Sequence, residues 1–284
     1  MIVVTGANGH FGRAVVEQLL ARVDPSRIGV SVRDPDKAQA IEARGVRVRR
    51  GDFTDGASLR VAFEGATQVL LVSSNAAATG GDPIAQHQTA IAAAKAAGVK
   101  RIIYTSHMGA SPASAFHPCV DHATTEDMLR QSGVAFTSLR NGFYASTALD
   151  AATKSIATGE LRAPADGKVA WTSRADLAEA AAVVLVQEGL FDGPTPPLTA
   201  GEAVDFRELA AMVSALTGRS IAHVVVSDDD FRKGATAKGM SAQMAGFVLT
   251  LYLAARAGEF SAVHPALERV LGRKPTSVRD SLTS

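Results

Sequence analysis

Cysteine is almost absent from this chain of 284 residues, which contains one, Cys119. A single cysteine excludes an internal disulfide and a cysteine-rich zinc site, and it suits a reducing compartment. An excess of charge is absent as well, because 29 lysine and arginine residues are balanced by 28 aspartate and glutamate residues. Since neither sign dominates, we expect no nucleic acid as a partner and no attraction to a charged membrane surface.

A hydrophobic run long enough to cross a bilayer is also missing. The most apolar stretch, Met244 to Ala255, is shorter than the roughly 20 residues that a spanning helix needs. We therefore expect a core or pocket-lining helix there. Because an apolar strand pattern begins directly after the first methionine, we expect no signal peptide. Together with the single cysteine, this predicts a cytoplasmic protein without a metal centre.

The clearest motif that is present lies in the first twelve residues. Gly6, Gly9 and Gly12 follow an apolar run at residues 2–4 and precede a helical pattern over residues 13–21. Strand, glycine turn and helix together predict a phosphate-binding β-α-β start. Gly6 permits a tight turn, Gly9 lets a pyrophosphate approach the backbone, and Gly12 lets the helix lie close to the sheet. The alternative is a turn that only connects a strand to a helix.

Short apolar runs alternate with helical patterns as far as residue 144. This rhythm predicts an α/β fold with a doubly wound parallel sheet, a Rossmann fold. The predicted strands are Ile2–Val4, Ile28–Val32, Val46–Val48, Gln68–Val72, Arg101–Tyr104 and Val134–Leu139. We expect a dinucleotide-binding domain over residues 1–144. Residues 145–284 are expected to form a smaller, partly interleaved α/β region that binds the substrate.

The carboxyl ends of these strands carry small, polar or aromatic residues. Ligands of doubly wound sheets lie at this edge, so the strand ends predict the binding site. They are Gly6–Gly12, Arg33, Asp52-Phe53, Ser73-Ser74, Thr105-Ser106 and Asn141–Tyr144.

The end of the second strand indicates which cofactor is bound. NAD enzymes place an acidic residue here to hold the ribose hydroxyls, whereas this chain has Arg33. A guanidinium pairs well with a 2′-phosphate, which favours NADPH. Asp34, one residue later, leaves NADH as an alternative, and a solvated surface role for Arg33 is also open.

Some positions allow two interpretations. Asp52 either lies at the adenine edge, with Phe53 beside the ring, or caps a helix from Ala57 to Phe63. His87 is expected to be a surface or interface histidine. Met240 and Met244 either line an adaptable pocket or pack a helix. Further along the chain, residues 193–197 are expected to form a turn before a short strand at residues 198–199.

With these residues in view, the chain resembles the NmrA-like branch of the atypical short-chain dehydrogenase/reductases. Within that branch it is most similar to the NAD(P)H:quinone oxidoreductase type 2 group, with the triphenylmethane reductases nearby. The resemblance covers nearly the whole chain and is weakest over residues 234–259. Its motifs are Thr5–Gly12, Val32–Ala38, Ala93–Lys100, Tyr104–Ser106, Thr125–Leu129, Leu139–Tyr144 and Arg174–Asp176.

The resemblance implies an NADPH-bound enzyme that reduces a small quinone-like molecule by two electrons, with NADH as a possible substitute. It implies that the pyrophosphate contacts the first turn, the 2′-phosphate contacts Arg33, and the adenine lies near Asp52 and Phe53. The first-turn residues are Thr5, Gly6, Asn8, Gly9, His10, Phe11 and Gly12. The ribose and nicotinamide are implied near Ser73, Ser74, Thr105 and Ser106, and the quinone near Asn141, Phe143 and Tyr144.

The chain departs from the wider superfamily in one respect. The usual Tyr-x-x-x-Lys dyad is missing, because no lysine occurs between Arg101 and Lys154. Orthodox members use that tyrosine to protonate a carbonyl oxygen. A quinone needs less help, since its reduced oxygen is weakly basic and water can protonate it. His122 is a tentative catalytic residue that would donate a hydrogen bond or a proton; a structural histidine is the alternative.

Two functions follow from the resemblance. The first is hydride transfer from NADPH to a quinone or a similar conjugated acceptor. The second is a dinucleotide-binding redox sensor of the NmrA type, without turnover. The sequence shows no extra interaction domain, and we expect a monomer or a homodimer.

Overall fold

The computed structural model describes residues 1–283, which form two compact units. Unit 1 contains Met1–Ser106, Asp121–Arg140 and Ala175–Pro196. Unit 2 contains His107–Val120, Asn141–Arg174 and the residues from Pro197 on. Each unit is therefore built from three separate segments of the chain. The assignment of cofactor and substrate roles to residues 1–144 and 145–284 stays a prediction.

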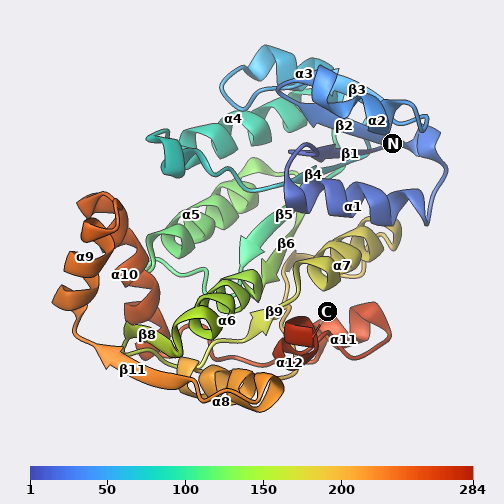
Figure 1. Ribbon diagram of the computed structural model, residues 1–284. Coiled ribbons are helices and arrows are strands. Elements are labelled where there is room, and N and C mark those ends of the chain that lie inside the picture. Colours follow the sequence, from blue (N-terminus) through green and yellow to red (C-terminus); the bar gives the residue numbers. More distant parts are fainter. Residues whose placement is uncertain (284) are drawn as a thin grey trace. The chain divides into compact units, whose positions relative to one another are not determined.

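Unit 1 is built on a seven-stranded parallel sheet of order β10-β6-β5-β4-β1-β2-β3 (Figure 1), so the predicted α/β fold is confirmed. Strands β1, β2 and β4 are buried along their whole length, as expected of a parallel sheet covered on both faces. The strands are β1 Ile2–Thr5, β2 Ile28–Val32, β3 Arg47–Arg50, β4 Gln68–Leu71, β5 Arg101–His107, β6 Ala135–Asn141 and β10 Gly193–Pro194.

Helices cover both faces of this sheet (Figure 1). On one face, Leu59, Phe63, Ile91 and Leu129 from three helices pack against alternate strand residues such as Ile102. Helices α1 and α7 lie on the opposite face. The helices are α1 His10–Leu20, α2 Gln39–Glu42, α3 Gly56–Phe63, α4 Pro83–Ala96, α5 His117–Ser132 and α7 Arg174–Val186. Short 3-10 turns occupy Pro25–Arg27, Pro35–Ala38 and Ala76–Thr79.

The edge beyond β6 differs from the prediction. Gly193–Pro194, expected in a turn, forms β10 and pairs in parallel with Thr137 and Ser138 of β6. A proline is tolerated at a sheet edge because no further strand needs its missing N–H. The strand predicted at residues 198–199 is wrong, since these residues make only an isolated bridge between Leu198 and Asn141.

Unit 2 has its own core. Trp171 stacks on Phe206 at 6.1 Å between ring centroids, and both are buried. Two small parallel sheets, β8 with β11 and β7 with β9, complete the unit. Its elements are β7 Phe143–Tyr144, α6 Ser146–Thr158, β8 Glu160–Pro164, β9 Trp171–Thr172, α8 Phe206–Thr217, β11 Ala222–Val226, α9 Asp228–Ala237, α10 Ala242–Arg256, α11 Ala266–Leu271 and α12 Val278–Thr283.

The apolar stretch predicted as a core or pocket-lining helix is α10. It buries Ala245 and Leu249 but leaves Met244 and Phe247 exposed. Among residues 1–283, no helix is both long and apolar enough to cross a membrane.

Candidate functional site

The glycine turn after β1 leaves an open cradle at the first turn of α1. Gly6 has a φ of +63°, a region that favours glycine, and its carbonyl accepts the N–H of Gly9 at 2.9 Å. Gly9 is the exposed N-cap residue of α1, and no side chain caps this helix. A Cβ on Gly12 would lie 2.5 Å from Gly6 O. The turn therefore presents backbone N–H groups and a helix N-terminus, which suits a pyrophosphate.

Two predicted cofactor residues in this turn have structural partners. The Thr5 hydroxyl donates to Leu70 O at 3.1 Å and accepts the N–H of Val72 at 2.9 Å, so it joins the ends of β1 and β4. Asn8 donates from Nδ2 to Asp34 O at 3.0 Å and so holds the turn beside the end of β2. His10 is exposed and Phe11 is buried.

The end of β2 presents a basic side chain. Arg33 is exposed, while the Asp34 carboxylate is paired with Lys37 at 3.0 Å. The acidic residue is thus already bound by a cation, and Arg33 is available for a phosphate. These features fit NADPH at this edge of the sheet.

Asp52 is not the cap of the next helix. Its carboxylate accepts the N–H and the hydroxyl of Thr54 at 2.9 and 2.8 Å, whereas Asp55 caps α3 by accepting the N–H of Ser58 at 3.1 Å. The N–H of Thr54 lowers the pKa of Asp52, and Arg33 lowers it further. The capping interpretation of Asp52 is therefore wrong. Phe53 packs against the core of unit 1.

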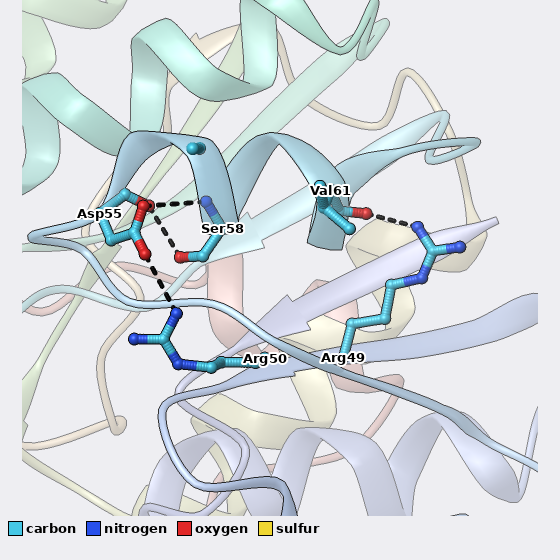
Figure 2. Close-up of a pocket in the computed structure, with 6 residues that line it drawn as sticks. Arg49, Arg50, Asp55, Ser58 and Val61 are labelled. Atoms are coloured by element: carbon cyan, nitrogen blue, oxygen red, sulfur yellow. Dashed lines mark hydrogen bonds and ion pairs between the residues drawn. The ribbon is translucent and has the colours of Figure 1, made fainter.

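A hollow of about 530 Å³ lies beside β3 and α3. Figure 2 shows that its charged side chains are already paired: Arg50 binds Asp55 at 3.0 Å, and Arg49 donates to Val61 O. Its lining residues are Arg49, Arg50, Asp55, Ala57, Ser58 and Val61. None of them is a predicted site residue, so this hollow adds nothing to the cofactor site.

Backbone N–H groups hold the residues after β4 against two buried side chains. Ser73 donates its N–H to the Thr105 hydroxyl at 2.8 Å, and Ser74 donates its N–H to His87 Nε2 at 2.8 Å. The structure thus brings together the predicted residues at the ends of β4 and β5.

His87 is buried, with 1% of its surface exposed, so the prediction of a surface histidine is wrong. Because Nε2 accepts a backbone N–H, the neutral ring carries its proton on Nδ1, which donates to Thr125 Oγ1 at 2.8 Å. Burial lowers the pKa of His87 to about 4. The ring therefore stays neutral near pH 7 and holds the backbone of Ser74.

An ion pair between a buried carboxylate and a half-buried arginine lies beside the hydroxyl of Ser106. Glu126, 2% exposed, accepts the Ser106 hydroxyl at 2.7 Å and two N–H groups of Arg140 at 3.1 and 2.7 Å. The bond to Glu126 raises the pKa of Arg140. The Ser106 hydroxyl is thus the donor of this hydrogen bond, and the Glu126 carboxylate is the acceptor. We call these two hydrogen-bonded groups, Ser74 with His87 and Ser106 with Glu126 and Arg140, the strand-end network.

His122 lies on α5 and is partly exposed. Its Nδ1 is 2.7 Å from the hydroxyl of Tyr104, which is fully buried. Burial raises the pKa of Tyr104, so the phenol stays protonated near pH 7. The contact holds the imidazole of His122 in place from one side.

In unit 2, Asn141 has a buried side-chain amide, 3% exposed, and neither Nδ2 nor Oδ1 has a partner within residues 1–283. A buried amide without partners is unfavourable by roughly 1–3 kcal/mol. The next residue is confined, because a Cβ on Gly142 would lie 2.2 Å from Thr172 Oγ1. The backbone therefore fixes an amide that is suited to a bound polar group.

The aromatic cluster of unit 2 consists of His107, Phe116, Phe143 and Phe260. Phe143 lies 5.9 Å from Phe116 and 5.3 Å from Phe260 between ring centroids. Tyr144 lies under the Arg174 guanidinium, 4.8 Å from its ring centroid, and burial raises its pKa. Met240, just before α10, and Met244, in its first turn, are 37% and 38% exposed.

Sequence reasoning gave no role to His107, Glu126 or Arg140, and it placed His87 on the surface. Glu126 and Arg140 lie in two of the recognised motifs, 14 residues apart, and no local pattern pairs them. No group of three or more His, Cys, Asp or Glu side chains in residues 1–283 is arranged to hold a metal ion.

Residues 6–188 match a protein family described as NAD(P)H-binding. The whole chain is 35% identical to quinone oxidoreductase 2 of Escherichia coli, 98% of which is covered. It is also 30% identical to an NAD(P)H azoreductase of Xenophilus azovorans, over 96% of this chain and 93% of that one.

Two solved structures match the fold along the whole chain. One is an NADPH-dependent quinone oxidoreductase from E. coli complexed with NADPH, with a TM-score of 0.93, 34% identity and 99% of that chain covered. The other is the triphenylmethane reductase of Citrobacter sp. complexed with NADP(H), with a TM-score of 0.92, 31% identity and 99% covered.

Proposed function

Because the chain belongs to the NAD(P)H-binding family, we propose that it is an NADPH-dependent reductase that transfers a hydride to a quinone or a similar conjugated acceptor. The observation that carries this proposal is the open glycine cradle at α1, next to an exposed Arg33 at the end of β2. Two of its relatives are named as a quinone oxidoreductase and an azoreductase, and both names favour a conjugated acceptor.

The cofactor would be held by four groups of residues. The turn over Gly6–Gly12 supplies N–H groups to the pyrophosphate, and Arg33 pairs with the 2′-phosphate. Asp52 and Phe53 lie near the adenine. Ser73, Ser74, Thr105 and Ser106 lie at the ends of β4 and β5, where the ribose and nicotinamide would bind. When bound, NADPH supplies the hydride.

The acceptor would contact Asn141, Phe143 and Tyr144. The unpartnered amide of Asn141 offers a donor and an acceptor to polar atoms of the substrate. The ring of Phe143 offers an apolar face, as conjugated molecules require.

No tyrosine–lysine dyad supplies a proton, so positioning of the reactants would provide most of the rate enhancement. The phenol of Tyr104 is bound to His122 and buried, which makes it a partner of the histidine rather than a proton donor. We assign His122 a positioning role, with water as the final proton source.

We also propose that the protein acts in the cytoplasm as a monomer or homodimer and has no nucleic-acid partner. The near balance of charge and the single buried cysteine support this. Size-exclusion chromatography with light scattering would determine the oligomeric state.

The decisive experiment follows NADPH oxidation at 340 nm with a panel of benzoquinones, naphthoquinones and dyes. We expect steady turnover with at least one quinone, and weaker activity with NADH. Tight NADPH binding without turnover across the whole panel would contradict the enzyme and would support a dinucleotide-binding regulator.

A further inference from the structure

Arg50 is the last residue of β3, and the function proposed above gives it no role. It lies opposite Val32, the last residue of β2, and the N–H of Gly51 donates to Val32 O at 2.9 Å. Since neighbouring strands are about 4.8 Å apart, Arg50 and Arg33 leave the same edge of the sheet side by side. The strand end, and not the hollow that Arg50 also lines, therefore places it next to Arg33.

The direction of the Arg50 side chain follows from its partner. Figure 2 shows Arg50 pointing to the start of α3, where its Nη1 donates to Asp55 Oδ2 at 3.0 Å. The neighbouring Arg49 points to the other end of this helix and donates to Val61 O. Because α3 follows β3 along the chain, its start lies at the carboxyl edge of the sheet, where ligands of such sheets bind. Arg50 therefore points to the ligand-binding edge and Arg49 points away from it.

The guanidinium of Arg50 still has N–H groups to donate. The side chain is 56% exposed, and neither Nε nor Nη2 has an acceptor within residues 1–283. An exposed ion pair such as that with Asp55 contributes little to stability. Its effect is to orient the planar guanidinium: Asp55 holds Nη1, and the other two nitrogens can bind an anion.

The charge of both arginines acts on the same carboxylate. The N–H of Thr54 lowers the pKa of Asp52 most, and the charges of Arg33 and Arg50 lower it further. The carboxylate accepts its hydrogen bonds from Thr54, and within residues 1–283 it forms no ion pair with either arginine. The two guanidiniums therefore lie close to one another and both remain available to a ligand.

We propose that Arg50 is a second ligand of the 2′-phosphate of NADPH, beside Arg33, and therefore a second determinant of the choice between NADPH and NADH. This inference rests on the cofactor site proposed above. A phosphate monoester carries a charge of about −1.5 to −2 near pH 7, which is more than one guanidinium neutralises. Two guanidiniums from adjacent strands match both this charge and the three oxygens of the group.

The test compares NADP⁺ and NAD⁺, which differ only in the 2′-phosphate and have no hydride to donate. Isothermal titration calorimetry measures the affinity of each for the whole chain. We expect Arg50→Gln to weaken NADP⁺ about tenfold, the effect of roughly one lost charge-assisted hydrogen bond, and to change NAD⁺ less than twofold. Arg50→Lys keeps the charge but loses the fork of N–H groups, so it should restore only part of the affinity for NADP⁺.

Arg49→Gln is the matched control, because it removes the same charge one residue away from a side chain that points to the other end of α3. It should change both affinities less than twofold. If Arg50→Gln does not fold, Arg50→Met, which keeps an apolar stem, replaces it in the same comparison.

Equal losses for NADP⁺ and NAD⁺, no loss for NADP⁺, or a loss as large in Arg49→Gln would overturn the role of Arg50 while leaving the assignment of Arg33 intact. A wild type that binds NADP⁺ no more tightly than NAD⁺ would overturn the proposed preference for NADPH, and this inference with it.

Discussion

The strand-end network of unit 1 and the aromatic cluster of unit 2 hold their side chains by different interactions. In the network, hydrogen bonds to charged and neutral groups fix the orientation of the side chains. Glu126, for example, accepts hydrogen bonds from both Ser106 and Arg140. In the cluster, ring contacts of 5.3 to 6.5 Å dominate, with His107 as the polar exception. Hydrogen bonds specify one geometry, whereas apolar ring contacts tolerate several.

This difference suggests why one family includes relatives named for quinones and for azo compounds. Under the proposed function, directional bonds would match a cofactor that is always the same, and adaptable rings would match a varied acceptor. Five predictions test the contrast.

The largest effect is expected at the glycine cradle. Gly9→Val places a branched side chain over the N–H groups at the start of α1, so NADPH affinity should fall by more than about a hundredfold. Isothermal titration calorimetry on the folded variant checks this. Gly246→Ala in α10, where a Cβ meets nothing within 4 Å, is the control. Unchanged affinity in folded Gly9→Val would mean that the phosphates bind elsewhere.

Acid should destabilise both units by the same mechanism. The pKa of His87 and of His107 is lowered to about 4 in the fold, against about 6.5 in the unfolded chain. Between these values the unfolded state binds more protons than the folded state. The contribution of the two histidines to the free energy of unfolding is therefore fully present above pH 6.5 and is lost as pH decreases towards 4. For His87 the full loss is about 3 kcal/mol.

Urea unfolding between pH 4.5 and 7.5 measures this slope. His87→Gln and His107→Gln should each flatten it, whatever their stability at pH 7.5. A variant that keeps the wild-type slope would show that its histidine is not the group that binds the proton.

Arg33 should set the cofactor preference of unit 1. Arg33→Asp removes a charge-assisted pair with the 2′-phosphate, so NADPH affinity should fall about ten- to a hundredfold while NADH affinity changes little. Fluorescence titration of both cofactors measures the ratio. Arg60→Asp on the exposed side of α3 controls for the change in net charge. Equal losses for NADPH and NADH would contradict the assignment.

A smaller effect is expected at His122. His122→Ala should lower kcat for a benzoquinone about tenfold, because the imidazole positions ligands and water supplies the proton. A general acid would contribute about a hundredfold or more and would give a rate that falls as pH rises through its pKa. The pH profile of kcat for both proteins distinguishes these cases. A large loss together with disappearance of such a step would make His122 the catalytic acid.

The smallest effect should occur in the aromatic cluster. Phe116→Leu keeps apolar volume and loses one ring contact, so kcat/KM for quinones should change about threefold or less. Steady-state assays with several acceptors check this, and Phe63→Leu in the core of unit 1 serves as a packing control. A loss above tenfold for every acceptor would show that the cluster is as specific as the strand-end network.

The elements that sequence patterns predicted are those defined by neighbouring residues. The glycine spacing and the apolar run of β1 are local, and Arg33 follows β2 directly. The bond from Ser74 to His87 and the pairing of β10 with β6 join distant residues, and no local pattern contains them. His87 was misplaced on the surface because its partner Thr125 lies 38 residues away on another helix. The binding roles of all these residues stay predictions.

Unit 1 includes a late segment of the chain, and this has a consequence for folding during translation. Residues 175–196 supply α7, which covers one face of the sheet, and β10, which protects its edge. While the ribosome is still translating the middle of the chain, β1 to β6 have emerged but remain bare on part of one side. The sheet can therefore be covered on both faces and at its β10 edge only after about residue 196 has left the exit tunnel. For the same reason, a gene fragment cut after codon 144 would lack α7 and β10, and we expect it to aggregate more readily than the whole chain.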